Sequence, residues 1–251
     1  MTCNAFAQIR PVVYMDGKEK LNGFAVKPAK DSKKGAGVLI LPAWKGVDEH
    51  SKETAERLAA LGYHTFVADI YGEGNYPIDA KGAGERSTYY KTNYKAYTNR
   101  INLALQQLIK DGANADKIVV MGYCFGGTGA LEVARANMPV KGVVSIHGGL
   151  KRDAVRSIVA IKPAILVLHG ADDPSVPESQ VLAFQKEMRE SKADWQMIYY
   201  AGAVHAFTHK DAGSDASKGA AYHEVADKRS WQHLLTFLNE FFQAGADLPQ
   251  R

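Results

Sequence analysis

The sequence predicts an α/β protein with a doubly wound, mostly parallel sheet, and three features indicate this. Short β-branched runs alternate with segments of helical periodicity along most of the chain. The runs are apolar throughout, which favours strands that helices cover on both faces. No internal repeat, low-complexity tract or long linker divides the 251 residues. We therefore expect a single domain over residues 1–251, with its core at about 37–242.

Six runs predict the strands of the parallel sheet. They occupy residues 37–41, 64–68, 117–121, 141–146, 163–168 and 196–200. An antiparallel hairpin is expected before them, formed by 12–15 and 21–26 around the turn residues Asp16 and Gly17. Helices are expected at 51–61, 94–108, 127–137, 178–191 and 231–242. Gly62 should end the first of these in the left-handed conformation.

Composition and charge exclude several classes of protein. The formal net charge is +4, and the densest basic cluster, 30–34, contains Asp31 and suits a solvated loop better than a nucleic-acid site. No apolar run reaches the length of a membrane span, and the first residues lack the pattern of a signal peptide. We therefore expect a cytoplasmic protein, monomeric or homodimeric, that binds neither nucleic acid nor membrane.

The two cysteines, Cys3 and Cys124, are not expected to form a disulfide, because one lies near a terminus and the other in a tight turn. They also lack the spacing of a thiolate zinc site. No other cluster of histidine and carboxylate residues has ligand spacing, so the sequence predicts neither a metal ion nor another cofactor.

A nucleophile turn is the strongest chemical signal. The segment GYCFGG at 122–127 directly follows a predicted buried strand and precedes a predicted helix. This is the context of a nucleophile elbow, with Cys124 in the place of the commoner serine. Glycines two positions either side are needed because Cβ atoms there would collide with strand and helix. The helix dipole favours the thiolate. The pattern predicts an α/β-hydrolase fold; a buried structural cysteine is the alternative.

The acid and the base should follow the elbow in that order. Asp172 and Asp173 come after the run at 163–168, and His205 comes after the run at 196–200. A carboxylate would hold the imidazole in the tautomer that accepts the thiol proton. We expect Asp173 in this role, with Asp172 bonding its own turn.

Most of the other seven histidines are expected to be inert. Two of them, His147 and His169, end strands and should make structural hydrogen bonds. Four are expected away from strand ends: His50, His64, His223 and His233.

An oxyanion hole needs two backbone N–H donors. We expect one from Phe125, next to the nucleophile, and the other from Trp44 in the loop after 37–41. The Trp44 ring could equally be a core aromatic.

The chain resembles the dienelactone hydrolase family over about residues 37–242. The resemblance includes GYCFGG at 122–127, DIYG at 69–72, GADDPSVP at 170–177 and HAF at 205–207. It implies an α/β-hydrolase fold and a triad of Cys124, His205 and Asp173.

Two departures from the family pattern concern the substrate. Lactone-cleaving members carry a glutamate that helps to deprotonate the cysteine, and Ala43 stands at that place here. They also carry an arginine four residues after the histidine, where this chain has His209. A second substrate-binding arginine could correspond to Arg86. The resemblance thus implies the fold and the nucleophile but not lactone specificity.

The resulting hypothesis is a hydrolase of small uncharged carboxylic esters that works through a thioester, with activated organophosphate triesters as side substrates. The pocket is expected to include Trp44, Tyr71 and Phe207, with Tyr89 or Tyr90 as further candidates. A dienelactone-type lactonase, a non-catalytic ligand-binding or redox-sensing relative, and a thiol acyltransferase are the alternatives.

Overall fold

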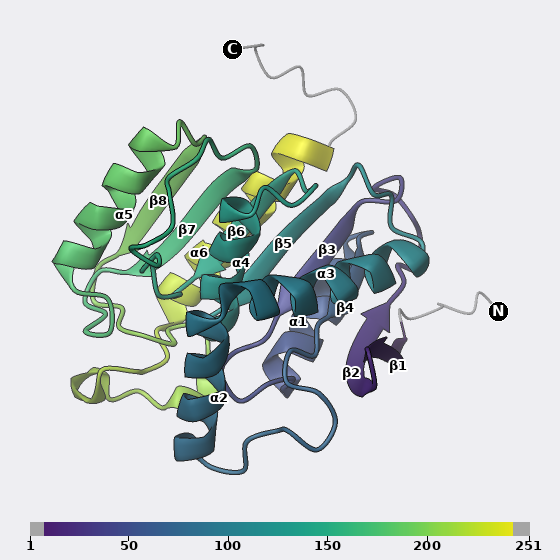
Figure 1. Cartoon of the computed structure of the whole chain (residues 1–251), viewed down its shortest axis with the longest axis horizontal. Helices are drawn as coiled ribbons and strands as arrows, with labels where there is room; N and C mark the ends of the chain where they lie inside the picture. Colours follow the sequence, from purple (N-terminus) through teal and green to yellow (C-terminus); the bar gives the residue numbers. More distant parts are fainter. Residues whose placement is uncertain (1–7, 243–251) are drawn as a thin grey trace.

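The computed structural model describes residues 8–242, which form an eight-stranded sheet flanked by helices (Figure 1). Along the sheet the strands follow the order β1-β2-β4-β3-β5-β6-β7-β8. The strands are β1 (Ile9–Asp16), β2 (Glu19–Val26), β3 (Gly37–Leu41), β4 (His64–Val67), β5 (Ile118–Tyr123), β6 (Gly142–Ile146), β7 (Ala164–Gly170) and β8 (Trp195–Tyr200). Strands β3 to β8 pair in parallel, whereas β1 and β2 are antiparallel to each other and β2 to β4. The doubly wound sheet and its N-terminal hairpin confirm the prediction.

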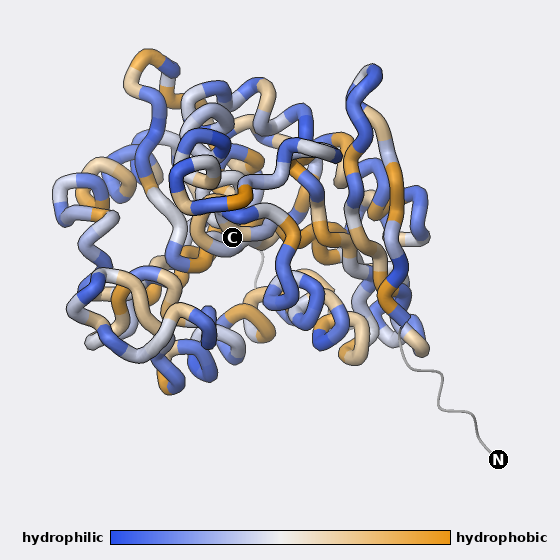
Figure 2. Tube along the Cα trace, turned by 90° about the horizontal axis from the view of Figure 1, so that it is seen from below, coloured by the Kyte–Doolittle hydropathy of each residue, from blue (hydrophilic) through white to orange (hydrophobic). Residues whose placement is uncertain are grey.

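Helices cover both faces of the sheet. They are α1 (Glu49–Ala60), α2 (Ala80–Thr92), α3 (Tyr94–Lys110), α4 (Phe125–Arg135), α5 (Glu178–Glu190) and α6 (Glu224–Phe242). Successive residues of a strand point to opposite faces, so Leu39 joins the core beneath α3, α4 and α5. Val38 and Ile40 join the core beneath α1 and α6. Seen from below, hydrophobic and hydrophilic residues are interspersed along the trace (Figure 2).

The six apolar runs all form strands, and most of their residues are buried, although β8 at the edge of the sheet is only partly buried. The run at 37–41 coincides with β3, which is buried throughout. The helix stop at Gly62 is also confirmed: its φ is +97°, and the Tyr63 N–H donates to the Leu58 carbonyl at 3.3 Å. The hairpin turn is one residue later than expected, since Asp16 pairs with Glu19.

Helix α2 was not predicted. Only Ala83, Ser87 and Tyr90 of this helix are buried, and they form a stripe that is too sparse to show as helical periodicity. An Asp79 carboxylate oxygen caps the helix by accepting from the Gly82 N–H at 2.7 Å.

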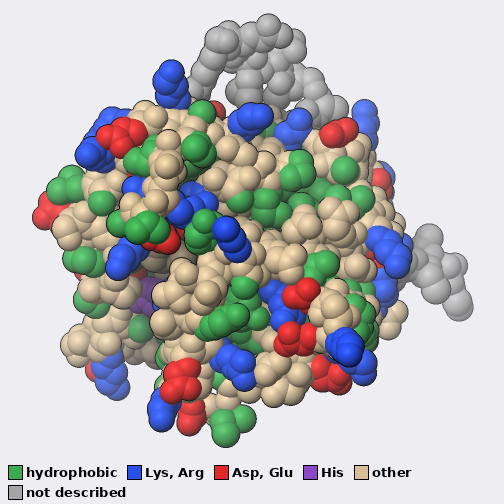
Figure 3. Space-filling model, in the orientation of Figure 1, with side chains coloured by type: hydrophobic (Ala, Val, Ile, Leu, Met, Phe, Trp, Pro, Cys, Tyr) green, Lys and Arg blue, Asp and Glu red, His purple; other side chains and the backbone are tan. Residues whose placement is uncertain are grey.

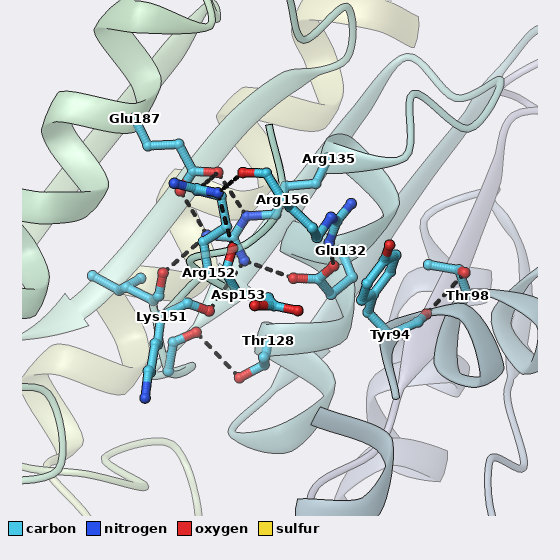
Figure 4. Close-up of polar contacts among 12 residues, drawn as sticks. Tyr94, Thr98, Thr128, Glu132, Arg135, Lys151, Arg152, Asp153, Arg156 and Glu187 are labelled. Atoms are coloured by element: carbon cyan, nitrogen blue, oxygen red, sulfur yellow. Dashed lines mark hydrogen bonds and ion pairs between the residues drawn. The ribbon is translucent and has the colours of Figure 1, made fainter. Parts of the chain in front are cut away.

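The connection between β6 and β7, residues 147–163, contains no helix. A buried ionic network takes the place of helix packing there (Figure 4). The Nε and Nη2 atoms of Arg135 donate to the two carboxylate oxygens of Glu187 at 2.9 and 2.8 Å. Nη1 of Arg135 donates to Glu132 at 2.8 Å, and Nη2 also donates to the Leu150 carbonyl at 2.9 Å. This single guanidinium therefore ties α4, α5 and the irregular segment together.

Removing the charge of Arg135 should destabilise the fold strongly. The side chains of Glu132 and Glu187 are only 7% and 6% exposed, so Arg135→Gln removes the cation that two buried carboxylates share and leaves Glu132 only Arg156 and Glu187 only Arg152. We expect the free energy of unfolding in urea to fall by about 3–5 kcal/mol. Arg189→Gln, an exposed arginine of α5, is the control and should change it by less than about 0.5 kcal/mol. Equal effects of the two changes would contradict this account.

Candidate active site

The turn that carries Cys124 lies between β5 and α4, at the carboxyl edge of the sheet. Cys124 has φ +52° and ψ −112°, a strained conformation for a residue with a side chain. A Cβ atom on Gly122 would lie 2.2 Å from the Gly126 carbonyl, and one on Gly126 would lie 2.1 Å from the Leu41 carbonyl. Glycine is therefore required on both sides of the turn, as the sequence predicted.

The three predicted triad residues come together from three loops. His205 Nε2 lies 3.0 Å from Cys124 Sγ, and His205 Nδ1 lies 2.9 Å from Asp173 Oδ2. Asp173 follows β7 and His205 follows β8. Because Asp173 accepts the Nδ1 proton, Nε2 is the nitrogen that exchanges a proton with the sulfur.

Asp173 is held in place by Ser175. The Ser175 hydroxyl donates to Asp173 Oδ1 at 2.6 Å, and its backbone N–H donates to the same oxygen at 2.8 Å. Burial alone would raise the pKa of Asp173, but the bonds from His205 and Ser175 outweigh burial and lower it. Asp172 instead accepts from the Gly202 N–H at 2.9 Å, so it bonds the neighbouring loop and not its own turn.

The His205 imidazole is the group that carries positive charge in the site. Its burial lowers the pKa, but the hydrogen bonds to Asp173 and Cys124 outweigh this and raise the pKa to about 10. The imidazolium is therefore stabilised while it faces the cysteine sulfur on one side and the carboxylate on the other.

The two backbone N–H groups expected in the oxyanion hole are those of Phe125 and Trp44. Within residues 8–242, neither the Phe125 N–H nor the Trp44 N–H donates a backbone hydrogen bond outside the regular elements, and Phe125 begins α4. The loop of Trp44 is brought close by the contact of Gly126 with Leu41 and Pro42. Both expected oxyanion donors thus lie on segments that touch.

Aromatic rings hold these two segments. The Tyr71 hydroxyl donates to the Trp44 carbonyl at 2.7 Å, and the Tyr97 hydroxyl donates to the Phe125 carbonyl at 3.0 Å. The Phe125 ring stacks on Tyr97 with a centroid distance of 4.6 Å and on Tyr71 at 5.6 Å. Tyr71 is only 1% exposed, so it positions the Trp44 loop and does not form a pocket wall as expected.

Of the other expected pocket residues, some are buried in the core and some are exposed on the surface. Phe207 is 0% exposed and packs between Tyr200 and His147, so it cannot line an accessible pocket. Ala43 is nearly buried within the turn before Gly46. Arg86 is exposed on α2 and donates to Asn75 Oδ1 at 2.9 Å.

The two tyrosine candidates for the pocket also differ in exposure. Tyr89 is 54% exposed, whereas Tyr90 is 6% exposed and packs against Tyr71.

His209 belongs to a buried cluster of rings. Its centroid lies 4.1 Å from that of His50 and 5.7 Å from that of Tyr123. Burial lowers the pKa of His209 and lowers that of His50 to about 3, so both rings are neutral at pH 7. His50 lies in α1, as expected for a histidine away from a strand end, but its ring reaches His209 because α1 begins just after the β3 loop at the carboxyl edge of the sheet.

His147 contributes more than the sequence indicated. The Cys124 N–H is shared between the Ile146 carbonyl at 3.0 Å and His147 Nδ1 at 3.2 Å. Nδ1 is thus an acceptor, so Nε2 carries the proton and donates to Thr208 Oγ1 at 2.9 Å. Burial holds the pKa of His147 well below its usual value. A neutral imidazole therefore links the nucleophile turn to the loop of His205, and only its place at a strand end could have suggested this.

Within residues 8–242, no group of three or more His, Cys, Asp or Glu side chains could hold a metal ion. No helix in this range is long and apolar enough to cross a membrane. On the face shown in Figure 3, acidic and basic side chains are interspersed.

Comparison with known proteins places this chain in a family. The sequence matches the profile of the dienelactone hydrolase family over residues 21–242. The chain belongs to the dienelactone hydrolase family. It is also similar to a carboxymethylenebutenolidase homolog of Mus musculus, with 26% identity over 196 residues that cover 76% of each chain. Membership of this family makes the protein a hydrolase.

Solved structures agree on the fold. A dienelactone hydrolase-like promiscuous phosphotriesterase from metagenomic libraries is 34% identical, covers 95% of this chain and 100% of its own, and has a TM-score of 0.89. An α/β-hydrolase enzyme from a Medee basin deep-sea metagenome library has a TM-score of 0.60 at 18% identity and covers 94% of this chain and 99% of its own, a likeness of fold alone. The predicted α/β-hydrolase fold is confirmed.

His147→Leu should slow hydrolysis of a chromogenic ester, because both hydrogen bonds of the imidazole are lost. We expect kcat to fall on the order of tenfold with little change in KM. His147→Gln keeps one acceptor and one donor and should recover most of the loss. Since the imidazole is neutral throughout, the pH profile of kcat should keep its shape in both variants.

Equal losses in the Leu and Gln variants, at matched melting temperature, would assign His147 a packing role only.

Proposed function

We propose that the protein hydrolyses small uncharged carboxylic esters through a thioester on Cys124. The observation that carries this proposal is the chain of contacts from Cys124 Sγ to His205 at 3.0 Å and from His205 to Asp173 at 2.9 Å. A nucleophile, a base and an orienting carboxylate in this order are the arrangement of a catalytic triad.

The first half-reaction forms the thioester. The Cys124 thiolate attacks the ester carbonyl carbon, and the developing oxyanion is stabilised by the N–H groups of Phe125 and Trp44. The tetrahedral intermediate then collapses as the bond to the leaving alkoxide breaks. His205, protonated at Nε2, donates that proton to the leaving oxygen, so that a neutral alcohol departs. Asp173 stabilises the imidazolium up to this step.

The second half-reaction releases the acid. His205 is now neutral and accepts a proton from a water molecule that attacks the thioester carbonyl. The same two N–H groups stabilise the second oxyanion, and the C–S bond breaks. The thiolate and the imidazolium are restored once the carboxylic acid leaves.

Organophosphate triester hydrolysis is a second candidate, and the phosphotriesterase that is 34% identical to this chain favours it. The thiolate would attack phosphorus and expel the activated leaving group. Release of more than one equivalent of leaving group per enzyme would show turnover, whereas a single burst followed by inactivation would show that Cys124 is only labelled.

The triad assignment predicts graded losses of activity. Cys124→Ala and His205→Ala should remove nearly all turnover of a chromogenic ester. Asp173→Asn should cost a factor on the order of 10³ to 10⁴, because the amide favours the wrong histidine tautomer. Asp172→Asn is the matched control and should cost far less, since the Asp172 carboxylate accepts from the Gly202 N–H whereas His205 bonds Asp173. Circular dichroism would verify folding, and the reverse order of the two aspartates would refute the assignment.

Charge near the site predicts a preference for neutral substrates. A substrate carboxylate that leaves water needs a cation, and His209 is a neutral imidazole. We expect a higher kcat/KM for a neutral aryl ester than for a dienelactone carboxylate. His209→Arg should narrow this ratio about tenfold through the added charge. His209→Gln removes the ring without adding charge and should not narrow it. A wild-type preference for the anionic lactone would overturn the prediction and favour the lactonase.

Two alternatives of other classes give different results in the same assays. A ligand-binding or redox-sensing relative would show no ester turnover with or without reductant. A thiol acyltransferase would give products that depend on an added alcohol or amine. A panel of chromogenic esters and lactones on wild type and Cys124→Ala therefore separates these functions.

A further inference from the structure

A cavity of about 520 Å³ lies between α5 and the irregular connection from β6 to β7. Cys124, His205 and Asp173 are not among its lining residues. Its volume is within the usual range for sites that bind small molecules. On the left half of the face in Figure 3, over these elements, hydrophobic, basic and acidic side chains lie next to one another. The site proposed for ester hydrolysis does not account for this cavity.

The inner wall of the cavity is apolar. Its accessible apolar surface comes from Ile158, Pro177 and Ala183, whereas Leu150 and Phe184 in the same lining are each only 1% exposed. The Phe184 ring is held from behind by Trp195, at a centroid distance of 6.0 Å. A ligand body of hydrocarbon would lose water-exposed apolar surface on entering, which favours binding.

The acidic side chains of the cavity are already neutralised. Both carboxylate oxygens of Glu187 accept from Arg135. Arg152 Nε also lies 3.6 Å from Glu187 Oε1. Glu190 pairs with Lys186 at 3.6 Å. These carboxylates therefore leave little acceptor capacity for a cationic ligand.

The polar groups of the cavity that remain free to bind a ligand are hydrogen-bond donors. Among residues 8–242, the Lys151 ammonium and the Ser179 hydroxyl have no hydrogen-bond or ion-pair partner. The Gln180 carbonyl oxygen accepts from the N–H groups of Leu150 and Lys151 at 2.8 and 3.1 Å. This fixes the orientation of the amide and leaves its NH₂ group unpartnered. Three cations and two carboxylates line the cavity, so an anion is the better match.

We propose that this cavity binds a small amphipathic carboxylate, with its hydrocarbon body against Ile158 and Ala183 and its carboxylate beside Lys151. The walls are fixed before binding, because Arg135 joins both of them: it donates to Glu187 on α5 and to the Leu150 carbonyl on the connection (Figure 4). A preorganised site requires little ordering when the ligand enters. The proposal does not depend on the identity of the catalytic triad.

Octanoate is the probe, titrated into the full chain by isothermal calorimetry, with octanamide as its neutral counterpart. Octanoate should bind and octanamide should bind markedly more weakly. Lys151→Gln should weaken octanoate binding by about fivefold, as expected for one exposed charge pair. Lys162→Gln, on the same connection but outside the cavity, should leave it unchanged.

A second pair of variants locates the bound octanoate. Ala183→Trp fills the cavity and should weaken binding by more than tenfold, whereas Leu182→Trp, at the adjacent exposed position outside the cavity lining, should not. Neither residue is part of the catalytic site, so ester turnover should persist and show that both variants fold.

Absence of octanoate binding, equal binding of octanamide, or binding that Ala183→Trp leaves unchanged would each overturn the proposal. Insensitivity to Ala183→Trp together with competitive inhibition of ester turnover would place the octanoate at Cys124.

Discussion

The close approach of three backbone segments at the nucleophile turn is the constraint on which the site depends. Gly122 and Gly126 let strand β5, helix α4 and the end of β3 touch without Cβ atoms between them. This contact places the N–H groups of Phe125 and Trp44 on adjoining segments. It also forces Cys124 to a φ of +52°, and the surrounding hydrogen bonds must sustain that strain. Any side chain larger than hydrogen at either glycine would separate the nucleophile from its expected oxyanion donors.

The histidine rings around Cys124 differ in charge. Three imidazoles, His50, His147 and His209, lie in one group of packed rings, and burial keeps each of them neutral. Of these four rings, only His205 has a raised pKa, because only His205 contacts both a carboxylate and the cysteine sulfur. The positive charge is thus confined to the ring that would transfer protons. A neutral His147 can hold the Cys124 N–H without competing for that charge.

The second constraint is the set of ion pairs around Arg135, which holds the connection from β6 to β7 in place of helix packing. The connection from β6 to β7 has no helix to bury an apolar face, and its carbonyl groups need donors. Arg135 satisfies the Leu150 carbonyl and neutralises Glu132 and Glu187 at once. The same arginine fixes both walls of the cavity beside α5. The stability of this face and the shape of its cavity therefore depend on one buried guanidinium.

The amino-acid sequence alone predicted the sheet, most of its flanking helices and the candidate triad, since buried parallel strands are continuous apolar runs and the elbow needs glycines at fixed spacing. It did not reveal α2, whose few buried residues form no clear stripe, or the proximity of His50 to His209. It also placed Phe207 and Tyr71 in the pocket, whereas both are buried. Only tertiary structure decided these points, because periodicity gives the face on which a side chain lies but not which loops meet at the carboxyl edge of the sheet.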